Sequence, residues 1–103
     1  MLLVCGVFIN AQAQSLRLNL SKDSTLVDGK YTYSIIVKIS GGKAPYNVEL
    51  YDNLWREGGK LIAKEENTNR SEIRFSDLSG NQTIYVSVES LIEKQGVTRS
   101  IKL

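Results

Sequence analysis

The side chains that could carry out chemistry in this 103-residue chain are mostly carboxylates. The chain has 11 Asp and Glu residues, no His, and a single Cys, Cys5. Without His, the usual catalytic triads and the Cys/His zinc sites are excluded. Calcium needs about six to eight converging oxygens, and Asp28 and Asp77 are candidates only if loops at one end of the sandwich bring them near other oxygens, because the chain has no D-x-D spacing. We therefore expect no enzyme activity, no cofactor and no metal.

Three aromatic residues are the candidate ligand-binding residues. Tyr51 and Tyr85 are out of phase with the alternating apolar residues around them, and Trp55 follows Tyr51 in the next loop. Exposed rings on a flat sheet face are what a protein or glycan partner would use. The alternative is that the two tyrosines only pack across their strands, a contribution of roughly 0.2–1 kcal/mol, while Trp55 covers the core.

The composition is that of one folded domain. Apolar residues make up 42% of the chain, charged residues 23%, and there is one Pro. The net charge of +2 comes from 13 Lys and Arg against 11 Asp and Glu, with the two signs interleaved. The chain has no basic stripe of the kind that indicates nucleic-acid binding.

Residues 1–13 resemble a signal peptide that is truncated at its N-terminus. Ten of the thirteen are apolar and none is charged. The apolar run is too short to span a bilayer, so we expect no transmembrane segment, and Ala11-Gln12-Ala13 is typical of a cleavage site. A basic residue should precede the run, but the first is Arg17. The alternative is that residues 1–13 form a first strand. Cleavage leaves residues 14–103 as a single cysteine-free domain.

Period-two alternation of apolar and polar residues is the dominant pattern after residue 13, and it predicts short strands. Turn residues separate the apolar runs, as in Asp28-Gly29, Gly41-Gly42 and Gly58-Gly59. A further short strand is expected at Lys60–Lys64, and a polar loop from Glu65 to Arg70. About seven strands predict an all-β, immunoglobulin-like antiparallel β-sandwich. We assign to its interior the aromatics in phase with core aliphatics: Tyr31, Tyr33, Tyr46 and Phe75.

Two segments resemble the PKD-like domains, and most closely the SprB-type repeats of bacterial surface proteins. Gly41-Gly42-Lys43-Ala44-Pro45-Tyr46 is similar to their "GG-x-x-PY" opening. Leu78-Ser79-Gly80, followed by Ile84-Tyr85-Val86-Ser87-Val88, is similar to the segment before the family's sixth strand. The chain departs from the pattern with Leu50 in place of a frequent Trp and Glu89-Ser90 in place of an Asp. The resemblance covers about residues 31–97 and implies an immunoglobulin-like, non-catalytic module.

Two functions follow as expectations. The first is an extracellular interaction or adhesion module of a secreted or cell-surface protein, with a protein or glycan at the cell surface as its partner. The second is a carbohydrate-binding accessory domain that uses its exposed aromatics. In an immunoglobulin-type sandwich the third and sixth strands are neighbours. Tyr51 and Tyr85 should therefore lie on one outer face.

Overall fold

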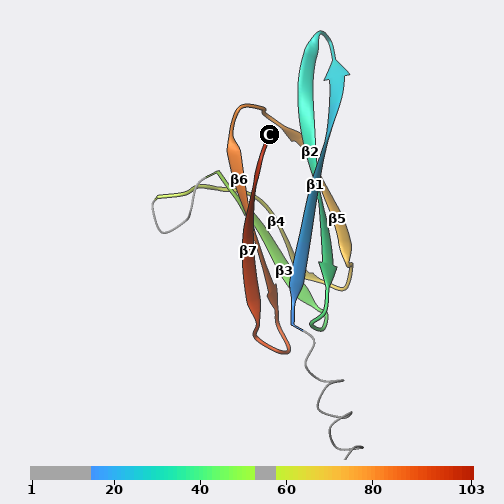
Figure 1. Ribbon diagram of the computed structural model, residues 1–103, viewed down its shortest axis with the longest axis vertical. Helices are drawn as coiled ribbons and strands as arrows, with labels where there is room; N and C mark the ends of the chain where they lie inside the picture. The colour runs from blue at the N-terminus through green and yellow to red at the C-terminus, as the bar shows by residue number, and fades with distance from the viewer. Residues whose placement is uncertain (1–14, 53–57) are drawn as a thin grey trace, which may run out of the picture.

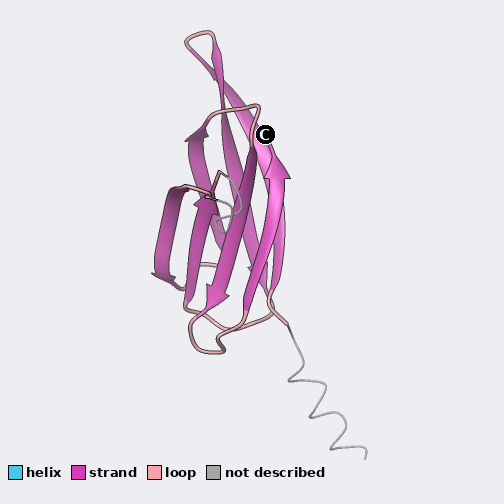
Figure 2. Ribbon diagram, turned by 90° about the vertical axis from the view of Figure 1, so that its left-hand side faces the viewer, coloured by secondary structure: helices cyan, strands magenta, loops and turns pink. Residues whose placement is uncertain are grey.

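The computed structural model describes residues 15–52 and 58–103, which form two antiparallel sheets packed face to face (Figure 1). One sheet has the strand order β1-β2-β5 and the other β4-β3-β6-β7. Figure 2 shows strands and loops throughout the described residues. The all-β sandwich predicted from the alternation is confirmed, and it is consistent with an immunoglobulin-like domain. The seven strands are β1 (Arg17–Val27), β2 (Lys30–Ser40), β3 (Tyr46–Tyr51), β4 (Leu61–Thr68), β5 (Glu72–Leu78), β6 (Thr83–Ser90) and β7 (Gly96–Lys102).

The core lies between the two sheets and is built from the residues of one alternation phase. Val48 and Leu50 of β3 and Val86 and Val88 of β6 have no solvent exposure. These two strands are central in their sheet, so their inward side chains are covered on every side. The other buried apolar residues are Leu16, Leu18, Ile35, Val37, Ile39, Tyr46, Ile73, Leu78, Ile84 and Leu103.

The hairpin of β1 and β2 extends beyond the rest of the sandwich (Figure 1). The pairing of β2 with β5 ends at Tyr33, whereas β1 and β2 stay paired up to the Asp28-Gly29 turn. We call residues 25–32 the arm. Tyr31 lies in the arm and is 62% exposed, so its assignment to the interior is wrong. Tyr31 alternates in phase with the buried residues of β2, but the opposite sheet ends before it reaches this position.

Strand β4 is longer than the sequence predicts. It runs to Thr68, so the segment from Glu65, expected to be a polar loop, is mostly strand. The polar residues are tolerated because β4 is an edge strand that pairs only with β3. Asn67 has a φ of 53°, and its N–H donates to Asn47 Oδ1 at 2.9 Å where the register shifts. An Asn adopts this left-handed conformation more readily than most residues.

The loop between β2 and β3 has the conformation that its residues predict. Gly41 and Gly42 have φ values of 67° and 60°, and Pro45 precedes the first residue of β3. A Cβ on Gly41 would overlap the backbone oxygen of Ser15, so this position accepts only Gly. Tyr46 then enters the core with 6% exposure. The predicted turn and the inward tyrosine are both confirmed.

Candidate functional site

Tyr51 and Tyr85 lie directly opposite each other on neighbouring strands. They are Cα partners in the antiparallel pair of β3 and β6. The next pair, Leu50 and Val86, is fully buried, which places the two tyrosines on the outer face of the sheet. Both tyrosine side chains are half-buried. The prediction that the rings share one outer face is confirmed.

Glu49 holds the Tyr51 hydroxyl. It lies two residues before Tyr51 on the same face, and the hydroxyl donates a hydrogen bond to Glu49 Oε1 at 2.7 Å. This bond, together with partial burial and the negative charge of Glu49, raises the pKa of Tyr51 above its ordinary value of 10.0. The ring is therefore oriented before any ligand arrives. A carboxylate beside a ring can also accept a hydrogen bond from a ligand hydroxyl or amide.

Short hydroxyl side chains surround Tyr85. Ser100 of β7 is its cross-strand partner, and Ser87 follows it on the same face of β6. The partner of Ser87 is Thr98, whose hydroxyl donates to Ser87 Oγ at 3.4 Å. Side chains of this size leave part of the Tyr85 ring exposed to solvent. The surface formed by Glu49, Tyr51, Tyr85, Ser87, Thr98 and Ser100 is called the tyrosine face below.

A shallow hollow of about 390 Å³ adjoins the tyrosine face. Leu61, the cross-strand partner of Tyr51, forms one wall, and Asp52 accepts a hydrogen bond from Lys60 N–H at 2.7 Å. The hollow thus combines carboxylates with apolar side chains. Its residues come from segments far apart in the chain, so alternation within one strand could not predict it. The lining residues are Asp52, Lys60, Leu61, Ile62, Asp77, Leu78, Ser79 and Gln82.

Two aspartates that the sequence offers as calcium ligands, Asp28 and Asp77, lie on different elements. Trp55 lies outside the described residues. Asp28 is in the turn at the tip of the arm, whereas Asp77 is near the end of β5. In residues 15–52 and 58–103, no group of three His, Cys, Asp or Glu residues is close enough to hold a metal ion.

Glu49 is the functional candidate that sequence reasoning missed. Its position two residues from Tyr51 gave the signal, because residues two apart in a strand share a face.

Within the described parts of the chain, no helix is long and apolar enough to cross a membrane. Comparison of the chain with protein-family models, with curated proteins and with solved structures finds no match.

Proposed function

We propose that this domain is a non-catalytic interaction module of an exported or cell-surface protein, and that it binds its partner through the tyrosine face. The observation that carries the proposal is the direct opposition of Tyr51 and Tyr85, with the Tyr51 hydroxyl held by Glu49. A ring with few rotatable bonds loses little conformational entropy when it binds, which is why tyrosine is favoured in recognition surfaces.

We also propose that the domain belongs with the PKD-like and SprB-type modules. The sandwich supports this, as do the two left-handed glycines ahead of Pro45 and the inward Tyr46. These features specify a fold more than an activity, because one fold hosts many functions. The ligand therefore has to be argued from the tyrosine face.

Export is part of the same proposal. A leader at residues 1–13 fits a module that works outside the cell, and the protein should be secreted or held at the cell surface. N-terminal sequencing of the secreted protein should begin at Gln14. Secreted protein that keeps Met1 would contradict cleavage.

A carbohydrate ligand is the second candidate. The surface offers two neighbouring rings, on which sugar rings can stack, together with the Glu49 carboxylate and the hydroxyls of Ser87 and Ser100. Sugar hydroxyls both donate and accept hydrogen bonds, so this mixture suits them. A protein partner would use the same rings as apolar anchors.

A printed glycan array with the labelled domain separates the two candidates. Saturable binding that Tyr51→Ala and Tyr85→Ala both abolish supports a carbohydrate ligand. Tyr31→Ala is the matched control, because Tyr31 is the more exposed ring but lies in the arm. Binding that survives both substitutions contradicts the tyrosine face as a sugar site. Absence of array binding, with adhesion to cell surfaces lost in the same variants, supports a protein partner.

A further inference from the structure

The edge strand β1 is exposed to solvent beside the arm. All of residues 21–27 are exposed, although they belong to a regular strand. Toward its start, β1 is tied to the other sheet, since Leu16 N–H donates to Gln95 Oε1 at 3.0 Å. Lys22 Nζ donates to the Lys102 carbonyl at 2.7 Å. Beyond Lys22 no contact with β7 of this kind is formed by the described residues.

Apolar side chains gather at the end of this edge. Leu26 is 58% exposed and Val27 48% exposed, and Tyr31 is the cross-strand partner of Leu26. Leu26 and Tyr31 continue the core phase past the end of the opposite sheet, and residues 15–52 and 58–103 leave both side chains largely exposed. An exposed strand edge that carries apolar side chains is a template for pairing with another strand.

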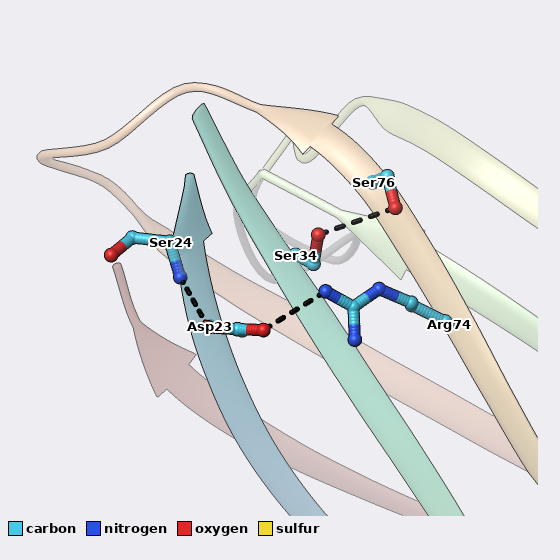
Figure 3. Close-up of polar contacts among 5 residues, drawn as sticks. All are labelled: Asp23, Ser24, Ser34, Arg74 and Ser76. Carbon is cyan, nitrogen blue, oxygen red and sulfur yellow. Dashed lines mark hydrogen bonds and ion pairs between the residues drawn. The ribbon is translucent and has the colours of Figure 1, made fainter. Parts of the chain in front are cut away.

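One hydrogen bond indicates which residues of β1 turn their backbone N–H and C=O groups away from β2. Ser24 N–H donates to Asp23 Oδ1 at 2.9 Å, on the side of β1 away from β2 (Figure 3). Pairing groups alternate along an antiparallel strand, so Lys22 and Leu26 also turn their N–H and C=O groups outward. Three residues of β1 therefore present groups to which a further strand could bond.

Charge excludes two registers for pairing between two copies of this edge, and the centre of the exposed stretch of residues 21–27 is Ser24. A two-fold register centred on Lys22 sets lysine against lysine, and one centred on Asp23 sets aspartate against aspartate. The register centred on Ser24 places no like charges opposite each other and uses all of residues 21–27. It puts Leu26 against the aliphatic stem of Lys22 of the second copy, and Asp23 against a Thr25 hydroxyl.

We propose that β1 pairs with β1 of a second copy of this chain, antiparallel and centred on Ser24, to join the two three-stranded sheets into one. In this register the charged Asp28 at each arm tip lies opposite Leu20 of the other copy, two residues from Lys22 on the same face of β1. This opposite charge favours the second copy over an unrelated strand. The surface is separate from the tyrosine face, which lies on the other sheet.

Asp23 limits how strongly the copies pair. Its carboxylate bonds the Ser24 amide and also accepts from Arg74 Nη2 of β5 at 3.0 Å (Figure 3). The Ser24 amide must leave this carboxylate before it can bond to the second copy. Dimerisation is therefore reversible and depends on concentration. Asp23→Ala should lower the dimer dissociation constant roughly 10- to 100-fold, because a two-fold dimer frees two Ser24 amides, one from each copy.

Sedimentation equilibrium of the whole protein over a range of concentrations tests the proposal. Two substitutions of the exposed Leu26 test the register. In the proposed dimer Leu26 lies opposite Lys22 of the second copy, so the sign of a charge placed at position 26 should decide whether the dimer forms. Leu26→Glu should tighten the dimer and Leu26→Lys should abolish it, whereas a merely sticky patch would be weakened by both. Ile92→Ser removes an exposed apolar side chain from the loop between β6 and β7 and should leave the dimer unchanged.

Ser24→Pro provides a second route to the same answer. It removes an N–H that β2 does not use, so circular dichroism should show an intact fold while the dimer is lost. The proposal is overturned if the wild type and Asp23→Ala are both monomeric at every concentration. It is also overturned if Leu26→Glu and Leu26→Lys act alike, or if folded Ser24→Pro still dimerises.

Discussion

The carboxylate of Glu49 changes the acidity of Tyr51, and this can be measured directly. Because the hydroxyl donates to a charged carboxylate, ionising the phenol would lose a hydrogen bond and set two negative charges side by side. In an ultraviolet titration, Tyr51 should ionise above its ordinary pKa of 10.0. Glu49→Gln keeps an acceptor but removes the charge, so the pKa of Tyr51 should move back toward that value.

The same hydrogen bond determines the direction in which the free energy of unfolding changes at high pH. A pKa that folding raises means that the folded state favours the neutral phenol. The contribution of Tyr51 is therefore complete below the unfolded-state pKa of 10.0 and is lost as the pH rises through the higher folded-state value. The loss should be smaller in Glu49→Gln. An unfolding curve with equal alkaline sensitivity in both proteins would show that the Tyr51–Glu49 bond does not form in solution.

Gly80 lies against the ring that closes one end of the core. A Cβ at this position would meet Tyr33 Cζ at 3.2 Å and Cδ1 at 3.3 Å, so the ring would have to move. Gly80→Ala should cost roughly 1–3 kcal/mol of unfolding free energy, as overpacking does. Gly96→Ala is the control, because its new Cβ would only touch Val88 O at 3.7 Å. Equal stability of the two variants in urea would exclude this contact.

At the scale of elements, Ser90 joins two loops at the end of β6. Its hydroxyl is fully buried and donates to the Lys43 carbonyl at 2.6 Å, and it accepts from Glu93 N–H at 3.3 Å. Ser90→Ala should cost about 1–3 kcal/mol, since the Lys43 carbonyl is left unpaired. Ser87→Ala is the matched control on the outer face of the same strand. A urea midpoint shared by both variants would contradict this role.

The strands were predictable where alternation coincides with burial on one side. That condition holds for β3 and β6, and their inward and outward residues, Tyr51 and Tyr85 included, follow from the sequence. It fails for β1, where residues 21–25 are all polar and exposed and give no alternation of apolar residues. It also fails in β5, where Asp77 has a φ of 62° and the register with β2 shifts, so that Leu78 turns inward out of phase with Ile73.

The candidate site was predictable only in part, for a related reason. The outward phase of two strands and their adjacency in an immunoglobulin-type sheet place both tyrosines on one face. The bond from Tyr51 to Glu49 depends on which rotamers the two side chains adopt, which phase does not determine. The hollow beside Leu61 depends on how β4 and the β5–β6 loop end in space. Such endings depend on tertiary packing and not on the local pattern.

Across the whole molecule, the proposed function assigns stability and recognition to opposite faces of one sheet. The inner face of β3 and β6 is fully buried, and the outer face carries the paired tyrosines. Removal of outward rings should therefore affect a partner more than the fold. The arm of β1 and β2 belongs to the other sheet. Changes in self-association through β1 should leave binding at the tyrosine face intact.

The most direct test of this account is the unfolding free energy in urea of the Tyr51→Ser and Tyr85→Ser double variant, compared with the wild type. If the rings serve a partner, the variant should lose less than about 1 kcal/mol, the upper value for a cross-strand pair, while its adhesion to surfaces that retain the wild type falls. A loss of more than about 1 kcal/mol with undiminished adhesion would contradict the account and make the two tyrosines part of the sheet's own packing.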